Sequence, residues 1–196
     1  MEHKFFEEPR CHDRAFYGGR GAADHINQAT SALRIHLAAG YAAYVARFHE
    51  VRSIGDFGAG SGGLLMLLEH NLVPPETRRY GYDLCPANVA VAQERGLDVA
   101  HRDFVNEDVE WPDLLVMTET LEHLVDPPEF LKRIPRGTWV VFTVPLADDG
   151  KRHDKTHLWG WTEKSFPRMC MVAGFDVHVW DEMLDKFQVL VGRKER

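Results

Sequence analysis

The sequence is poor in cysteine and contains no long apolar run. Its three cysteines, Cys11, Cys85 and Cys170, are an odd number without paired spacing. This pattern argues against a disulfide framework or a cysteine zinc site and predicts a reducing, cytoplasmic environment. No apolar stretch reaches the roughly 20 residues that a membrane-spanning helix needs. The first residues also lack the basic start and apolar run of a secretory signal, so we expect no contact with a membrane.

Basic residues are also in the minority, with 23 Lys and Arg against 30 Asp and Glu, which gives a formal net charge of −7. A protein that holds polyanions by bulk electrostatics should be basic, so sequence-independent nucleic-acid binding is disfavoured, although a substrate held by a local patch fits this charge. Hydrophobic residues make up 44% of the chain, enough for a core. We expect one domain over residues 24–196, preceded by an irregular segment, residues 1–23.

What the sequence does contain is an alternation of strand and helix patterns. In the first predicted helix, apolar residues including Leu33, Leu37, Tyr44 and Phe48 recur at helical spacing. Alternation of this kind is typical of an open parallel sheet with helices on both faces, and the last two strands, with no helix between them, should pair antiparallel. The predicted helices are 24–48, 62–70, 86–95, 128–134 and 163–173, and the predicted strands are 51–57, 79–83, 97–101, 113–117, 138–144, 175–180 and 187–191.

A glycine-rich loop, residues 53–63, joins the first predicted strand to the next helix. Glycines allow positive φ and let a ligand approach the backbone closely, so this loop is the expected floor of a nucleotide pocket. Asp83 ends the second predicted strand, where a carboxylate can accept both ribose hydroxyls. Gly58, Gly60 and Gly63 also match the dinucleotide-binding pattern, so the glycines alone leave the kind of nucleotide open.

Asp56 distinguishes between the two nucleotide classes. Its carboxylate, two residues before Gly58, can pair with an ammonium group, whereas it would repel a pyrophosphate. A nicotinamide enzyme also usually needs a second portion that holds the substrate, and little chain is left for one. Both points disfavour a nicotinamide oxidoreductase.

The run from Asp56 to Gly62, which reads DFGAGSG, resembles the first motif of the class I S-adenosylmethionine (SAM) dependent methyltransferases. The resemblance extends roughly from Ser31 to Arg193. It implies a Rossmann-like, seven-stranded, mostly parallel sheet of order 3-2-1-4-5-7-6, in which strand 7 is antiparallel and helices cover both faces. It also implies that the protein is a methyltransferase with SAM as its cofactor.

The same resemblance implies a contact for each part of SAM. The glycine loop would line the methionine part, Asp83 would bind the ribose and Leu84 would pack beside the adenine. Asp103 would accept a hydrogen bond from the adenine amino group, with Phe104 against the ring, unless Asp103 is only a surface turn residue. The residues expected to contact the cofactor are Asp56, Gly58, Ala59, Gly60, Asp83, Leu84, Asp103, Phe104 and Glu119.

An acidic and histidine-rich run follows the predicted strand 113–117. In a helical turn, Glu119, Glu122 and His123 would share one face, and an open α/β sheet binds ligands at the carboxyl ends of its strands. Together with His157, or with His153, these side chains could hold a divalent cation. In a metal-free interpretation, Glu119 faces the SAM ammonium, Glu122 caps or pairs, His123 packs, and His157 or His153 acts as a general base or holds the loop.

The Glu-x-x-Glu-His run resembles two branches of the same family. One is the quinone-biosynthesis and related small-molecule O-methyltransferases, and the other is the small-RNA 3′-terminal 2′-O-methyltransferases. In the second branch, this run and a later His-x-Phe-Glu-Trp segment hold a magnesium ion. Here the later segment, residues 157–161, reads HLWGW. It lacks the glutamate, which weakens the RNA interpretation.

We therefore predict methyl transfer from SAM to a hydroxyl oxygen of a small molecule. A hydroxyl with a pKa above about 10 needs a base or a cation, and Glu122, His123 and His157 are placed for either role. An amine acceptor would be met by an Asn/Asp-Pro-Pro-aromatic segment, whereas the Asp-Pro-Pro run at residues 126–128 comes too late after the strand. Methylation of an RNA 3′ end and a catalytically inactive SAM-fold binding protein stay open as alternatives, and residues 1–23 are a candidate lid.

Overall fold

A computed structural model describes residues 2–4, 29–69, 72–147 and 156–196 of the chain. The predicted helix start at Asp24, the candidate ligand His153 and most of the candidate lid, residues 1–23, lie outside the described residues. The helices are α2 (Ala29–Phe48), α3 (Gly63–Glu69), α4 (Pro86–Glu94), the 3-10 helix η2 (Leu121–His123), α5 (Pro127–Arg133) and α6 (Ser165–Val172). The strands are β1 (Glu2–Lys4), β2 (Ser53–Phe57), β3 (Arg78–Asp83), β4 (Val99–His101), β5 (Leu114–Thr118), β6 (Trp139–Pro145), β7 (Trp159–Trp161), β8 (Phe175–Met183) and β9 (Phe187–Lys194).

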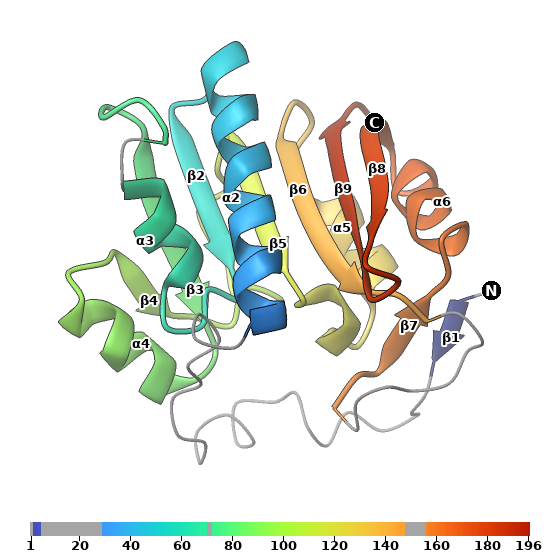
Figure 1. The fold of residues 1–196 in the computed structure, drawn as a ribbon, viewed down its shortest axis with the longest axis horizontal. Coiled ribbons are helices and arrows are strands. Elements are labelled where there is room, and N and C mark those ends of the chain that lie inside the picture. Colours follow the sequence, from blue (N-terminus) through green and yellow to red (C-terminus); the bar gives the residue numbers. More distant parts are fainter. Residues whose placement is uncertain (1, 5–28, 70–71, 148–155) are drawn as a thin grey trace.

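The seven-stranded sheet has the order β4-β3-β2-β5-β6-β9-β8. The first five strands in this order, β4, β3, β2, β5 and β6, run parallel. Strand β9 is antiparallel to both of its neighbours, β6 and β8. Numbering these seven strands along the chain turns the order into 3-2-1-4-5-7-6 (Figure 1). The predicted Rossmann-like α/β fold with an antiparallel strand 7 is therefore confirmed.

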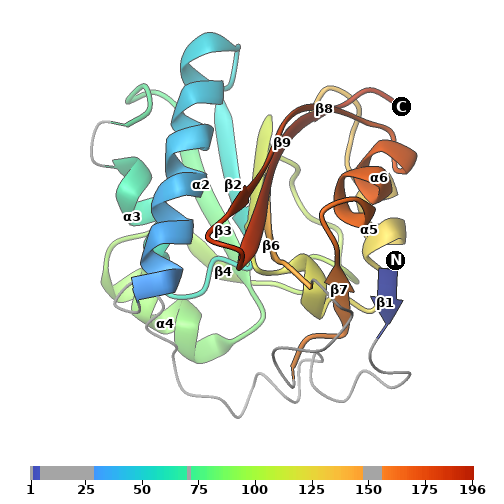
Figure 2. The ribbon, with the colours of Figure 1, turned by 45° about the vertical axis from the view of Figure 1, so that its right-hand side comes forward.

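Helices cover both faces of this sheet (Figure 2). On one face, α2 and α3 pack against apolar side chains that include Leu114 and Val116 of β5. On the other face, α5 and α6 pack against Leu115 and Met117 of the same strand. Strand β5 is thus apolar on both sides, as expected for a central parallel strand. The functional groups must therefore lie at the ends of the strands, where the chain leaves the core.

Local signals explain where several helices begin and end. Asp126 caps α5, because its side-chain Oδ1 accepts a hydrogen bond from the backbone N–H of Glu129 at 3.0 Å. The Asp-Pro-Pro run at residues 126–128 is therefore a helix start, which agrees with discounting it as an amine-binding segment. Gly174 follows α6 with φ +95, the left-handed conformation typical of a helix C-terminus.

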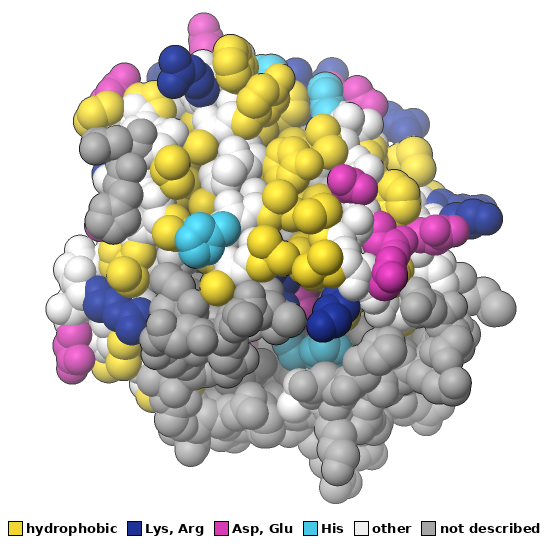
Figure 3. Space-filling model, in the orientation of Figure 1, with side chains coloured by type: hydrophobic (Ala, Val, Ile, Leu, Met, Phe, Trp, Pro, Cys, Tyr) yellow, Lys and Arg dark blue, Asp and Glu magenta, His cyan; other side chains and the backbone are white. Residues whose placement is uncertain are grey.

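The apolar stripe predicted for α2 is wrong in part. Leu33, Tyr44 and Phe48 are exposed, and the last two contact each other at the surface with ring centroids 4.9 Å apart. Figure 3 shows hydrophobic side chains gathered over the face that α2 covers. The buried side of the helix is instead rich in small residues, which allow it to lie close across the sheet. The buried residues of α2 are Ser31, Ile35, Ala38, Ala39, Ala42, Val45 and Ala46.

Sequence reasoning missed the pairing of β1 with β7. The two strands are antiparallel, with His3 opposite Gly160, and β7 lies between β6 and α6 in the chain. Three-residue strands are too short to show a period-2 pattern. None of the helices in the described part of the chain combines the length and apolar character that a bilayer crossing requires.

Candidate active site

The glycine loop between β2 and α3 is shaped by left-handed glycines. Gly58 and Gly60 have φ of +86 and +55. The backbone N–H of Gly58 donates to the carbonyl of Tyr82 at 2.8 Å, which ties the loop to the end of β3. A Cβ on Gly58 would lie 2.8 Å from Cγ2 of Thr120, next to the end of β5. Both the conformation and the space therefore require glycine at this position.

Asp83 is held at this loop by backbone and side-chain donors. Its Oδ2 accepts from the N–H of Gly60 at 2.7 Å, and its Oδ1 accepts from the N–H of Cys85 at 2.8 Å and from Nδ2 of Asn88 at 3.2 Å. The residue is buried. These contacts set the carboxylate beside the loop, where the resemblance expects the ribose of SAM.

Asp56 is a buried carboxylate near the end of β2, two residues before Gly58. It is 1% exposed, and its Oδ1 has no hydrogen-bond partner. Burial, with the neighbouring charge of Asp83 as a second cause, raises its pKa to about 8. A buried carboxylate is costly unless a cation or hydrogen-bond donors meet it. The site can therefore accept a positive group from a ligand.

Glu119 follows β5 in a conformation unusual for a residue with a side chain. Its φ is +51, and its Oε2 lies 3.2 Å from Nη1 of Arg34 on α2. Burial raises the pKa of Glu119 to about 7, against the opposing effect of the Arg34 charge. The expected shared helical face with Glu122 and His123 does not form, because η2 begins only at Leu121 and Glu119 precedes it. Glu119 is thus directed to Arg34.

Asp103 and Phe104, the two residues expected at the adenine amino group and ring, both make contacts within the chain. The carboxylate of Asp103 accepts hydrogen bonds from the N–H groups of Val105 and Asn106, at 3.2 and 3.1 Å, so it serves its own turn. The ring of Phe104 is buried, 5.2 Å from that of Phe57 between centroids. Phe104 therefore belongs to the core beneath the edge. Leu84 is half-buried.

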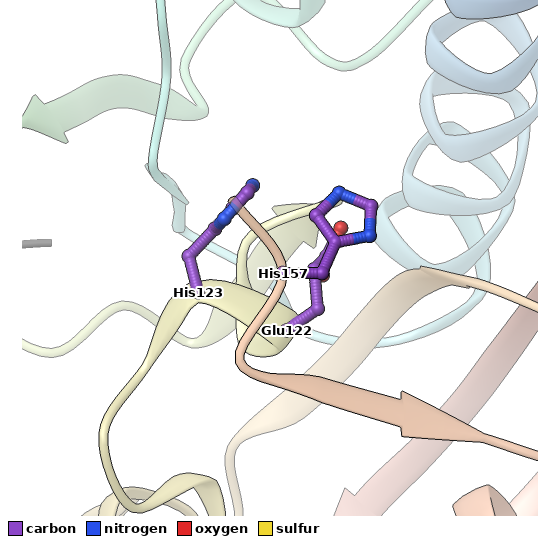
Figure 4. Close-up of side chains that lie close together, drawn as sticks. All are labelled: Glu122, His123 and His157. Atoms are coloured by element: carbon purple, nitrogen blue, oxygen red, sulfur yellow. The ribbon is translucent and has the colours of Figure 1, made fainter. Parts of the chain in front are cut away.

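Glu122 and His123, neighbours in η2, come together with His157 from the segment before β7 (Figure 4). Each offers a ligand atom, and these atoms all lie within 4.8 Å of one another. Glu122 is fully buried, and the two imidazole rings meet edge to face with centroids 5.0 Å apart. The three residues form a constellation that can bind a cation or share a proton.

Two hydrogen bonds join the segments that carry this cluster. The N–H of Leu158 donates to the carbonyl of Glu122 at 2.8 Å, and Nδ1 of His123 is 3.1 Å from the carbonyl oxygen of Thr156. Because a carbonyl only accepts, Nδ1 is the donor. A neutral His123 then carries its lone pair on Nε2, the nitrogen suited to a proton or a metal.

Three of the four predicted metal ligands are therefore close together, and the fourth, Glu119, is paired with Arg34. Sequence reasoning missed Arg34 altogether. The available signal was an arginine directly before Ile35, the first buried apolar residue of an alanine-rich helix face. A charge at the border of a buried face is worth examining as a functional group.

Comparison with known proteins identifies the family and supports the fold. A family model described as a methyltransferase domain matches residues 31–186, and no curated protein matches the chain. A protein solved in complex with the Trm112 methyltransferase activator of Haloferax volcanii is 17% identical, with a TM-score of 0.69 over 88% of this chain and 94% of that one. The cyclase SpnF is 14% identical, with a TM-score of 0.68 over 91% and 86%. A SAM-dependent methyltransferase from Clostridium acetobutylicum is 10% identical, with a TM-score of 0.65 over 88% and 96%. At such identities the likeness shows the fold alone.

Proposed function

Because the chain belongs to the methyltransferase domain family, we propose that it transfers the methyl group of SAM to a hydroxyl oxygen of a small molecule. The observation that carries the SAM assignment is the glycine loop. Its left-handed backbone is tied to Asp83 through Gly60, and it directly follows β2, which carries the buried carboxylate of Asp56. SAM offers matching groups, namely a ribose diol and an ammonium.

In the proposed complex, Gly58, Ala59 and Gly60 line the methionine part and Asp83 binds the ribose. Leu84 packs beside the adenine. The turn formed by Asp103 lies beside the adenine amino group. The carboxylate of Asp103 accepts a hydrogen bond from this group through lone pairs that the hydrogen bonds of the turn do not use. Asp56 lies beneath the loop, where it stabilises the positive end of the methionine part.

Methyl transfer from a sulfonium is an in-line displacement, so the protein mainly aligns a deprotonated nucleophile with the methyl carbon. Glu122, His123 and His157 lie at the carboxyl edge of the same sheet. We assign proton removal from the acceptor hydroxyl to His157 or His123, with Glu122 stabilising the imidazolium that forms. This role needs no metal.

The same cluster supports a second version of the proposal, in which a divalent cation assists. Two imidazoles and a carboxylate suit a borderline transition metal such as zinc better than magnesium. A bound metal would lower the pKa of the acceptor hydroxyl. The convergence of these three residues also keeps methylation of an RNA 3′ end as an alternative acceptor, since they fill part of the metal-binding set that this branch is expected to use.

Calorimetric titration with SAM tests the cofactor assignment. We expect Asp83→Asn to weaken SAM binding by about 10- to 100-fold, because charge-assisted hydrogen bonds to the ribose are lost. Asp98→Asn is the matched control, since the side chain of Asp98 is 65% exposed, and it should leave binding unchanged. If the two variants bind SAM with equal affinity, Asp83 does not bind the ribose.

Labelled SAM offered with phenols, catechols, amines and an RNA 3′ end then tests the acceptor. We expect label on oxygen of a small molecule. Transfer only to amines or only to RNA would overturn the acceptor class. SAM binding without transfer to any acceptor would indicate an inactive binding protein.

A further inference from the structure

We propose that one face of the molecule is an interface with a second copy of this chain. The face consists of the outward side of α2 and of the strands β6, β9 and β8 beside it. In this dimer, α2 of each copy lies over β9 and β8 of the other copy. The proposal is independent of the cofactor and of the acceptor, because none of its residues belongs to the proposed active site.

The outward side of α2 is both apolar and exposed. Leu33, Tyr44 and Phe48 are 39%, 59% and 62% exposed. Together with Gly40 they follow one another at intervals of seven and four residues, so they lie on one side of the helix, opposite the buried side around Ala42. A helix that is apolar on both sides is normally covered on both. The outward side of α2 is therefore suited to contact another molecule.

Gly40 lies in the middle of this outward side. Glycine inside a helix is less stable than alanine, yet a Cβ at Gly40 would meet none of the surrounding chain within 4 Å. The packing of the single chain therefore gives no reason for a glycine at this position. A second molecule would give one, because glycine lets another chain pack directly on the helix backbone.

Beside α2, the sheet is bare on the same side. In Figure 1, none of the helices in the described part of the chain lies in front of β6, β9 and β8. Val179 of β8 is half-buried and lies opposite Val191, which packs with the residues under α2, so Val179 points to this side. Figure 3 shows hydrophobic side chains continuing from α2 onto these strands. The surface thus drops by about 10 Å, the thickness of one helix, beside α2, and α2 of a second copy would fill this step.

The charges on this face favour a second copy as the occupant. The fully charged residues of α2 are two arginines, of which Arg47 is exposed. Strand β8 instead carries the exposed acidic residues Asp176 and Asp181. One surface with a basic half and an acidic half is complementary to itself under a twofold rotation. An anionic lipid surface would be repelled by the acidic half.

Arg47 and Asp176 lie at the same level of the molecule. Directly after α2, the ring of His49 stacks on Trp139, the first residue of β6, with centroids 4.0 Å apart. Trp139 is opposite Arg193 of β9, which is opposite Asp176 of β8. Both charges therefore lie at the amino edge of the sheet. When α2 lies over β8 of the other copy with the amino edges together, Arg47 meets Asp176 of that copy, and twofold symmetry makes this contact twice.

The face is large enough for a dimer. Helix α2 has 20 residues, which makes it about 30 Å long and about 10 Å wide. Strands β9 and β8 add a band of about the same length and width. The two parts give a footprint of about 600 Å² per copy, close to the roughly 800 Å² that one partner contributes to a stable interface.

Analytical ultracentrifugation of the full chain at about 1 to 100 μM tests the proposal. We expect a dimer whose population grows with concentration. Phe48→Glu should raise the dissociation constant by about 100-fold or more, because it buries a carboxylate in an apolar contact. Val172→Glu is the matched control and should change nothing, since Val172 is 79% exposed on α6, on the other face of the sheet.

A charge exchange tests how the two copies meet. Arg47→Glu and Asp176→Arg should each raise the dissociation constant by about tenfold. The double variant should recover most of the loss, because the two charges then meet again with their signs exchanged. Far-ultraviolet circular dichroism should be unchanged in every variant, since all of the substituted side chains are exposed.

The other outcomes overturn the proposal in different ways. A monomer at every concentration, or equal dissociation constants for Phe48→Glu and Val172→Glu, means that this face is not a dimer interface. Charge reversals that the double variant does not compensate mean that α2 does not lie over β8 of the other copy. A monomer that binds anionic vesicles, and loses this binding in Phe48→Glu, would assign the face to a lipid surface instead.

Discussion

The amino edge of the central sheet, where its parallel strands begin, and the carboxyl edge, where they end, differ in how their charged side chains are paired. At the amino edge, a cleft of about 600 Å³ is lined by residues that include Asp113, Trp139 and Arg193. Asp113 accepts hydrogen bonds from the N–H groups of Arg52 and Ser53 at 2.8 and 3.1 Å. Arg193 lies 3.3 Å from Glu195. These charges have partners within the chain.

The carboxyl edge is different because its charges are buried and only partly matched. Asp56 has a buried oxygen without a partner, and Arg34 and Glu119 each keep one such atom despite their ion pair. Both carboxyl groups have raised pKa values. A hollow alone does not identify a functional site, whereas buried charges that lack partners indicate a ligand that would supply them.

The largest effect is expected from Gly58→Ala. An alanine at this position would have to adopt the left-handed φ of Gly58, which is unfavourable, and its Cβ would collide with Thr120. We therefore expect SAM affinity to fall by about 100-fold or more, equivalent to roughly 3 kcal/mol. Calorimetry measures the affinity and chemical denaturation the stability.

Gly96→Ala is the control for Gly58→Ala. Gly96 has a similar φ of +81, but a Cβ there would meet nothing within 4 Å. This variant should lose only about 1 kcal/mol of stability and keep its SAM affinity. Similar SAM affinities in both variants would mean that the loop at Gly58 is not the cofactor site.

A smaller effect is expected on metal binding. His157→Ala should weaken the affinity for zinc by about 10- to 100-fold, as for the loss of one ligand or its support, measured by competition with a chromophoric chelator. His178→Ala is the control from the amino edge, because His178 lines the cleft there. Equal zinc affinities in the two variants, or turnover unchanged after exhaustive EDTA treatment, would reject the metal-assisted version and favour the imidazoles as bases.

The smallest effect is expected from pH. The pKa of Asp56, raised to about 8, means that this group holds its proton at neutrality without ligand, whereas Glu119, with a pKa raised to about 7 opposite Arg34, titrates close to neutrality. Asp56 faces Asp83 from β3, and Glu119 faces Arg34 from α2. An ammonium lowers the pKa values of both carboxyls, so SAM binding releases protons. Affinity should rise with pH below these values by at most about tenfold per unit for each proton released.

The pH effect has a counterpart in stability. Asp56 binds its proton more tightly in the folded chain than in the unfolded one, so its contribution to stability declines as the pH rises from 3.8 to about 8. Asp56→Asn should remove most of this dependence in thermal denaturation, while Asp98→Asn should preserve it. If the SAM affinity of the unmodified protein does not change with pH, the raised pKa values of Asp56 and Glu119 are not linked to SAM binding.

The fold was largely predictable because its signals are local. Alternating patterns located the seven sheet strands, and the observed ends differ most at β8 and β9, which extend to Met183 and Lys194. The glycine loop and Asp83 were predictable for the same reason, because a short sequence motif marks both the loop and the end of the strand. The buried side of α2 was not, because alanines carry little apolar signal yet allow close packing.

The sequence by itself determined the order of the seven strands of the main sheet and the helices between them, the glycine loop, and the placement of acidic and histidine residues at one edge of the sheet. Only the tertiary structure decided which of these groups meet. Glu119 pairs with Arg34 because it precedes η2 in a left-handed conformation and α2 crosses the sheet beside it. Glu122 and His123 meet His157 because the segment before β7 is hydrogen-bonded to η2. Partners far apart in the chain are chosen by packing, and the spacing of residues within one motif carries no information about it.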